Sequence, residues 1–350
     1  MKNGLDIKTF RENPREPDFQ NLIKVFKREN PTRPTLFEFG LNQHIYDSLT
    51  ADIGYASGDP LLKFKKMADA FRIAGYDFVC IGGSGFHFKT KRKFNVIAKT
   101  FSQNEYVTIS DWADYERYEW PEPENYDYSV LDKIAGYLPD GMKIIICDSL
   151  GVLETVIDLA GYENLCLMLN DEPELVKQLF NQVGSRLLKY HQICAGYEIV
   201  GAHLFGDDWG FNTQTFISHN DMRKYVLPWH KKQVLAVHSA GKFAILHSCG
   251  NLTGVMEDVV GDLQYDAKHS FEDSIQPVEE AYKKYRDKIA ILGGIDVDFL
   301  CRAPIDEIYN RSTLLLEKCR TGYALGSGNS IPDYVPIENF LTMNAAALYG

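Results

Sequence analysis

The sequence predicts a single α/β domain that closes into a (β/α)8 TIM barrel. Short apolar segments alternate with amphipathic helical segments along the chain, which is the pattern of a parallel sheet covered by helices. Eight apolar segments of this kind can be counted, and eight strands is the number that closes such a barrel. The 350 residues, 45% of them hydrophobic, suffice for one large core. We expect residues 34–350 to form the barrel and residues 1–33 to form an N-terminal arm.

The eight expected strands are short and rich in β-branched and aromatic residues. In chain order they are Thr35–Phe39, Tyr76–Ile81, Lys143–Cys147, Glu198–Leu204, Phe243–His247, Leu263–Lys268, Ile289–Leu292 and Tyr323–Leu325.

Three of the intervening helices have clear signals. A helix over Asp171–Cys194 has Pro173 in its first turn and apolar residues at helical spacing. A second helix starts after Ser218, and Pro228 is expected to kink it or split it in two. Pro336–Tyr349 is expected to be the closing helix.

One segment interrupts the alternation of strands and helices. Residues 86–138 form an insertion after the second strand that is rich in tyrosine, tryptophan and acidic residues. We expect an excursion, partly a small antiparallel sheet, that covers the barrel mouth, because long loops in compact domains are usually functional covers. A solvated excursion is the alternative.

Composition and charge exclude several classes of function. The formal net charge is −11, which argues against the clustered Lys and Arg of a nucleic-acid surface. No apolar stretch approaches the roughly 20 residues of a membrane span, and the start of the chain does not read as a secretory signal. The 7 cysteines are scattered without a CxxC motif, so we expect reduced thiols and a cytoplasmic location.

Polar side chains follow nearly every expected strand, which is where (β/α)8 barrels carry their chemistry. The first five strand ends offer Glu38, Asp148, His203 with Asp207 and Asp208, and His247 with Cys249. The last three offer His269 with Glu272, Asp296 and Asn329. We expect Glu38 to face the site, because a lone carboxylate is costly to bury without a partner.

The sharpest local signal is His247-Ser-Cys249 at the end of the fifth expected strand. Residues i and i+2 of a strand point the same way, so an imidazole and a thiol should converge at the barrel mouth. Nitrogen and sulfur suit zinc, and Glu272 or His269 could supply a third ligand. The alternative is that Cys249 is a small buried apolar residue and His247 a satisfied polar one.

The acidic residues near the strand ends have two interpretations each. Asp207 and Asp208 could be catalytic carboxylates, or they could cap a helix. Asp296 follows two glycines and could be a general acid or a turn residue. The Gly326–Asn329 loop could cradle a phosphate, or it could simply make a tight turn.

These segments together resemble the uroporphyrinogen decarboxylase superfamily. The resemblance lies in residues 199–251, in Gly293–Asp296 and in the stretch from Gly326 to Ala346. It implies a (β/α)8 barrel and one of two chemistries. The decarboxylases act on porphyrinogen acetate groups and carry an arginine-glycine-arginine pattern after strand one and an aspartate after strand two. This chain has Glu38-Phe-Gly40-Leu-Asn42 and Gly82-Gly-Ser-Gly at those places.

The other branch holds zinc-dependent methyltransferases that exchange methyl groups with a corrinoid protein, and these share the HxC motif. Their third ligand is a cysteine after strand eight, a place filled here by Asn329. More distant relatives add a glutamate after strand six, where Glu272 lies. The resemblance thus implies a His247/Cys249/Glu272 zinc site, with Asp207, Asp208 or Asp296 as proton donor.

Three hypotheses follow. The first is a methyltransferase with zinc, a small-molecule substrate and a corrinoid partner protein, with Glu38, Asp148, His203 and Asn329 contacting substrate. The second is a decarboxylase-type lyase, and the third is a barrel that only binds. Relatives often pair, so a homodimer is part of the expectation.

Overall fold

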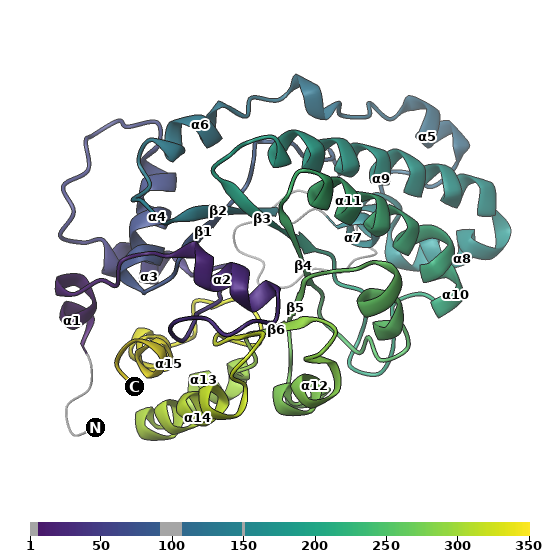
Figure 1. Ribbon diagram of the computed structural model, residues 1–350. Helices are drawn as coiled ribbons and strands as arrows, with labels where there is room; N and C mark the ends of the chain where they lie inside the picture. The colour runs from purple at the N-terminus through teal and green to yellow at the C-terminus, as the bar shows by residue number, and fades with distance from the viewer. Residues whose placement is uncertain (1–5, 92–106, 149–150) are drawn as a thin grey trace.

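The computed structural model describes residues 6–91, 107–148 and 151–350. Its centre is an all-parallel sheet of seven strands in sequential order, curled into a partial barrel with helices outside (Figure 1). The strands are β1 (Phe78–Ile81), β2 (Lys143–Asp148), β3 (Val200–Gly206), β4 (Phe243–His247), β5 (Ala267–His269), β6 (Ala290–Leu292) and β7 (Tyr323–Ala324). The predicted α/β class is confirmed, and these strands match seven of the eight expected ones.

The first expected strand, Thr35–Phe39, is reduced to a single parallel bridge between Leu36 and Leu325. Two backbone hydrogen bonds hold this bridge, from Phe37 N to Leu325 O and from Leu325 N to Thr35 O. The Phe37 ring also lies 5.5 Å from the ring of Phe78 in β1. The segment therefore lies between β7 and β1, held by the bridge on one side and by side-chain packing on the other.

Helices connect the strands and form the outer layer. Those before β2 are α1 (Ile7–Glu12), α2 (Phe19–Phe26), α3 (Gln43–Leu49), α4 (Leu62–Ile73), α5 (Trp112–Arg117), the short η1 (Pro123–Asn125) and α6 (Ser129–Ala135). Between β2 and β4 lie α7 (Val152–Ala160), α8 (Tyr162–Asp171), α9 (Pro173–Ala195), α10 (His219–Asp221), the π-helical turn η2 (Met222–Val226) and α11 (Leu227–Ser239). After β4 come the π-helical turn η3 (Asp258–Asp262), α12 (Val278–Tyr285), α13 (Val297–Arg302), α14 (Ile305–Lys318) and α15 (Ile337–Tyr349).

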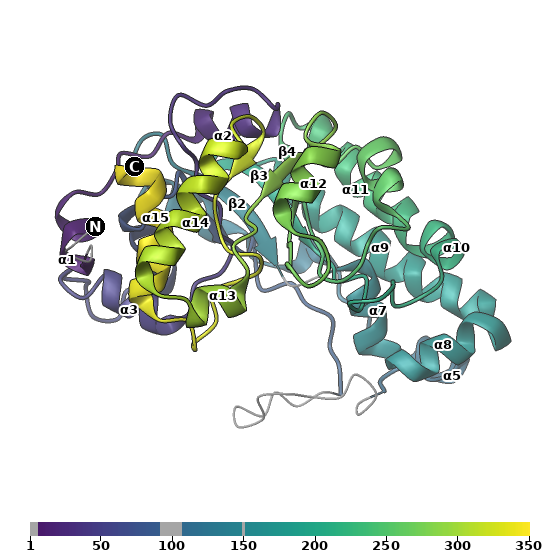
Figure 2. The same cartoon turned by 90° about the horizontal axis from the view of Figure 1, so that it is seen from below.

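The proline signals place helix boundaries as expected. Pro173 lies in the first turn of α9, and Pro228 lies in the first turn of α11 directly after the η2 turn. Because proline lacks the amide hydrogen that a helix interior needs, the split of the segment after Ser218 follows from Pro228. The expected closing helix is α15, which packs beside α14 (Figure 2).

The N-terminal arm closes one end of the sheet. Helix α2 crosses the end where the strands begin (Figure 1). The ring of Phe26 lies 5.2 Å from that of Phe243, the first residue of β4. Phe19 fills the space over Gly201 near the start of β3, where an added Cβ would lie 2.4 Å from the ring. Both contacts bury aromatic surface, so the barrel is sealed at this end.

The described part of the insertion differs from the expected cover. Residues 86–91 and 107–138 contain α5, η1 and α6 but no strand, and residues 92–106 lie outside the described residues. Arg186 of α9 binds Pro121 O and Glu122, and Gln182 of α9 binds the Tyr115 hydroxyl. The described part therefore packs along the outer face of α9, because aromatic and charged side chains there find partners on that helix.

No helix in the described ranges has the length and apolar character needed to cross a membrane.

Candidate active site

Three potential metal ligands converge where β3 and β4 end. His247 is the last residue of β4, Cys249 follows two residues later, and Asp208 follows β3. Gly206 of β3 pairs with His247, so the two loops leave the sheet side by side. His247 Nε2 lies 3.8 Å from Cys249 Sγ and 3.9 Å from Asp208 Oδ1. Among the described residues, these three form the group whose ligand atoms all lie within 4.8 Å of one another.

This donor set fits a zinc ion. Bonds of about 2.0–2.3 Å in tetrahedral geometry place zinc ligands roughly 3.3–3.8 Å apart, close to the distances found here. Burial, followed by the charge of Asp208, raises the pKa of the Cys249 thiol to about 12. Burial also raises the pKa of Asp208. An adjoining cation would favour the thiolate and the carboxylate, which are the forms that bind metals.

The Cys249 sulfur also accepts hydrogen bonds from two neighbours. Asn329 Nδ2 lies 3.3 Å from Sγ, and Ser270 Oγ lies 3.4 Å from it. The backbone N–H of Cys249 donates to Asp208 Oδ1 at 2.8 Å. Asn329, expected to contact substrate, thus points at the sulfur and occupies the place where the resemblance implies a third ligand.

Glu272, the third metal ligand implied by the resemblance, is not in this group, and Asp208 takes that position. The structure places Glu272 on the wall of an open pocket of about 950 Å³ beside the metal-ligand group. Burial raises the pKa of Glu272, and the charges of Asp296 and Asp208 add to the effect.

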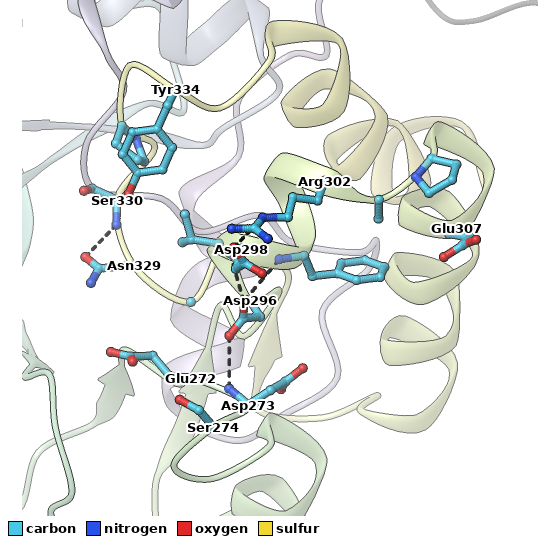
Figure 3. A pocket seen from close by; sticks show the side chains of 16 residues that line it. Glu272, Asp273, Ser274, Asp296, Asp298, Arg302, Glu307, Asn329, Ser330 and Tyr334 are labelled. Atoms are coloured by element: carbon cyan, nitrogen blue, oxygen red, sulfur yellow. Dashed lines mark hydrogen bonds and ion pairs between the residues drawn. The ribbon is translucent and has the colours of Figure 1, made fainter. Parts of the chain in front are cut away.

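The pocket is acidic (Figure 3). Its walls come from the segments after β5, β6 and β7, and Asn329 belongs both to its wall and to the surroundings of Cys249. The carboxylates that line it are Glu272, Asp273, Asp296, Asp298 and Glu307. Arg302 also lines it and pairs with Asp298 at 2.8 Å. The pocket is therefore better suited to a neutral or cationic molecule than to a polyanion.

Asp296 has a structural task as well as a place in the pocket. Its Oδ1 accepts hydrogen bonds from the backbone N–H of Asp298 and Phe299 and so caps α13. Its Oδ2 accepts one from the backbone N–H of Asp273 at 3.3 Å. The sequence left a general acid and a turn residue open for Asp296. The structure shows a helix cap instead of a simple turn residue, with the side chain still on the pocket wall.

Asp207 lies outside this site. Its carboxylate is fully buried and accepts hydrogen bonds from the backbone N–H of Leu153 and Glu154, from Trp209 Nε1 and from His230. It therefore caps α7 and ties the β3 end to α11. Successive strand residues point to opposite faces, which explains why Asp207 and Asp208 separate.

His203 also faces the helices. Its Nδ1 contacts His191 Nδ1 of α9 at 3.0 Å, and burial lowers the pKa of His203 to about 3. Neither Asp207 nor His203 belongs to the group of potential metal ligands formed by Asp208, His247 and Cys249. Asp148 ends β2, and its side chain lies outside the described residues.

Glu38 is buried one step behind the centre. Ser327 donates to Glu38 Oε2 from its hydroxyl at 2.7 Å and from its backbone N–H at 3.3 Å. Burial raises the pKa of Glu38 to about 8. Glu38 lines none of the described pockets. Glu38 therefore holds the loop after β7. Its expected contact with substrate stays a prediction.

Two further residues near the centre escaped the sequence analysis. Glu154, at the start of α7, is half-buried, and burial together with the charges of Asp207 and Asp208 raises its pKa to about 8. Lys268 of β5 is buried, and its ammonium donates to Ser270 O at 2.7 Å. Burial lowers the pKa of Lys268 to about 8. Its place at the end of the expected strand Leu263–Lys268 was the one signal available for it.

Comparison with known proteins now places the chain in a family. The model of the uroporphyrinogen decarboxylase (URO-D) family matches residues 104–348, well over half of the chain. The chain therefore belongs to the uroporphyrinogen decarboxylase family. No curated protein matches it.

One solved structure has the same fold. A methyltransferase from Methanosarcina mazei superposes with a TM-score of 0.70 over 96% of this chain and 100% of that one, at 16% sequence identity. A xylanase B from Clostridium stercorarium F9 gives a TM-score of 0.39 at 10% identity, over 58% of this chain and 73% of that one.

Proposed function

We propose that this protein is a methyltransferase that moves a methyl group between a small molecule and a corrinoid carried by a partner protein, with zinc at the barrel mouth. The observation that carries the proposal is the convergence of Asp208, His247 and Cys249 at the end of β3 and β4, beside an open pocket. The resemblance to the zinc methyltransferases supports the proposal, as does the Methanosarcina protein with the same fold, which is described as a methyltransferase.

In this proposal His247, Cys249 and Asp208 hold the zinc ion. A zinc ion bound there supplies Lewis acidity, which deprotonates a substrate thiol or polarises the heteroatom of a methyl donor. Asn329 and Ser270 donate hydrogen bonds to the Cys249 sulfur and so limit its negative charge. Because Asn329 lies where relatives have a thiolate, the centre carries less negative charge than theirs.

The pocket carboxylates serve as the proton source in this proposal. Glu272 faces the pocket with a raised pKa, so it holds its proton to a higher pH than an exposed glutamate. Asp296 lines the same pocket. A leaving oxygen or nitrogen that takes a proton from such a group as its methyl bond breaks becomes a better leaving group.

The residues that line the pocket follow β5, β6 and β7, so the pocket lies at the end of the barrel where these strands stop. Tyr334 stands at its edge with 72% of its surface exposed. We infer that the corrinoid protein docks at this end, and that the protein acts in the cytoplasm, since all seven cysteines lie in the described ranges as thiols.

A decarboxylase-type lyase is the second candidate, favoured by the description of the matching family. A substrate with several carboxylates needs positive partners. The pocket offers Arg302, already paired with Asp298, against five carboxylates. The charge of the pocket therefore supports methyl transfer over porphyrinogen decarboxylation.

Elemental analysis of anaerobically purified protein tests the proposal. We expect about one zinc ion per chain, loss of most of it in Cys249→Ser, and transfer of a methyl group to or from free cobalamin that a chelator abolishes. Cys166→Ser is the matched control, because Cys166 is an exposed thiol on α8. Protein without zinc that releases carbon dioxide from an acidic substrate, indifferent to chelators, would favour the lyase instead.

A further inference from the structure

A buried chain of hydrogen bonds runs behind His247. His247 Nδ1 lies 2.8 Å from His269 Nδ1, and His269 Nε2 lies 3.1 Å from the backbone carbonyl oxygen of Ser327. The Ser327 hydroxyl and N–H in turn reach Glu38. His269 and Ser327 are fully buried and His247 nearly so, so water does not compete for these bonds.

The carbonyl at the end of this chain fixes the protons of both rings. A carbonyl oxygen can only accept, so His269 Nε2 carries a hydrogen and donates it to Ser327 O. His269 is fully buried between an imidazole and a carbonyl, and within the described ranges no carboxylate is hydrogen-bonded to it, so its ring is neutral. The Nδ1 atom of a neutral His269 with a hydrogen on Nε2 is bare and must accept. His247 Nδ1 therefore carries the hydrogen between the two rings.

This leaves His247 Nε2 without a hydrogen, and Nε2 is the atom that faces Cys249 Sγ at 3.8 Å and Asp208 Oδ1 at 3.9 Å. Two phenylalanines keep the arrangement in place. The Phe39 ring lies 4.4 Å from the ring of His247, and the Phe37 ring lies 5.2 Å from that of His269. The two imidazoles stack at 25°, which leaves neither free to turn without displacing the other.

We propose that His269 is a positioning residue, which uses the Ser327 carbonyl to hold His247 in the tautomer whose free Nε2 lone pair points at Cys249 and Asp208. The effect of His269 on metal binding rests on the proposed function. The tautomer of His247 does not depend on that function. Carboxylates and carbonyls commonly orient metal-binding histidines. Here His269 lies between His247 and the backbone carbonyl of Ser327, so the carbonyl orients His247 through a second histidine. Glu38 holds the loop that carries this carbonyl.

The same loop also controls the other ligand. Ser327 orients His247 through His269, and Asn329, two residues later, donates to Cys249 Sγ. A shift of this loop would therefore disturb the nitrogen and the sulfur together.

Nitrogen-15 NMR of the metal-free full-length protein tests the tautomers directly. Among the 9 histidines, assigned by single substitutions, His247 should show a hydrogen on Nδ1 and His269 a hydrogen on Nε2. A hydrogen on His247 Nε2 would overturn the proposal. This measurement uses the unaltered chain and needs neither metal nor activity.

Cobalt(II) binding, followed by its visible absorption, tests the consequence. His269→Leu removes the acceptor and should weaken cobalt affinity by about 10–100-fold, the range found for such outer partners. His269→Asn places an amide oxygen at the same number of bonds from Cβ as Nδ1 and should recover part of the loss. His203→Leu removes one member of another buried histidine pair, which has no hydrogen bond to His247 or Cys249 within the described ranges, and should leave the affinity unchanged.

Unchanged affinity in His269→Leu would contradict the positioning role. If the unaltered protein binds no cobalt, the zinc part of the proposed function fails, and the NMR result still decides the tautomer.

Discussion

The side-chain amide of Asn329 donates a hydrogen bond to the sulfur of Cys249 across 3.3 Å, although the two residues are 80 positions apart in the chain. Asn329 comes from the loop after β7, and Cys249 from the loop after β4. The contact brings against the Cys249 sulfur the residue that the resemblance places where the zinc methyltransferases have their third ligand. It also makes the position open to direct tests.

Replacing Asn329 by cysteine should tighten zinc binding. A thiolate at this distance from Cys249 Sγ can join the group, and each soft ligand adds to zinc affinity, so we expect a gain of at least about tenfold. Competition with a chromogenic chelator measures it. Asn329→Ser, which removes the amide without adding a ligand, is the control and should show no gain. Equal affinities in the two variants would place the zinc elsewhere.

Substitutions at Asp208 and at Glu272 should have different effects on zinc binding. Asp208→Asn should lower zinc affinity by about tenfold or more, because it removes a charged oxygen 3.9 Å from His247 Nε2. Glu272→Gln should keep the zinc content and slow methyl transfer, since Glu272 faces the pocket. Metal analysis and turnover measured on the same preparations check both. Loss of zinc in Glu272→Gln would restore Glu272 as a ligand.

Asp207→Asn should destabilise the fold. The amide would turn a donor toward groups that all donate, namely two backbone N–H groups, Trp209 Nε1 and His230. We expect a loss of about 2–4 kcal/mol in the free energy of unfolding, measured by urea denaturation. Asp266→Asn, at a half-buried carboxylate that binds His238 and Ala244 N, should cost clearly less. Equal losses would argue against the capping role of Asp207.

Glu38 should make stability fall as the pH rises. Its pKa is raised from 4.5 to about 8 in the folded protein, so between these values the folded state holds a proton that the unfolded state has lost. The stabilisation that this proton gives to the folded state is fully present below the unfolded pKa. It declines by roughly 1.4 kcal/mol per pH unit between the unfolded and the folded pKa.

Glu38→Gln mimics the protonated side chain and removes this dependence. The difference in unfolding free energy between variant and parent should therefore move in favour of the variant from pH 5 to pH 8, each titrated with urea. A difference that stays constant over this range would show that Glu38 is ionised when folded.

The strands could be predicted because each is a short apolar run bounded by turns, and seven were found within a few residues. Thr35–Phe39 has the same pattern, yet it makes one bridge, because pairing depends on the neighbouring strand as well as on the segment. The fold of the described insertion residues could not be predicted, since its tyrosines and tryptophans match strands as readily as helices that pack on α9.

Within the site, the two-residue spacing of His247 and Cys249 was enough to predict their convergence. The choice between Asp207 and Asp208 was not available, because neighbours beyond a strand point to opposite faces and the sequence does not state the register. The pairing of Gly206 with His247 resolves it. The role of His269 behind His247 likewise depends on the pairing of these two residues across β4 and β5.

The aromatic seal that α2 forms across the strand starts has a kinetic consequence for the proposed reaction. Phe19 and Phe26 close that end, and the described acidic pocket lies on the opposite side. In the proposed reaction the small molecule therefore enters this pocket before the larger corrinoid protein covers it. Steady-state kinetics should accordingly show ordered binding, with the small molecule first, and no competition between the small molecule and the corrinoid protein.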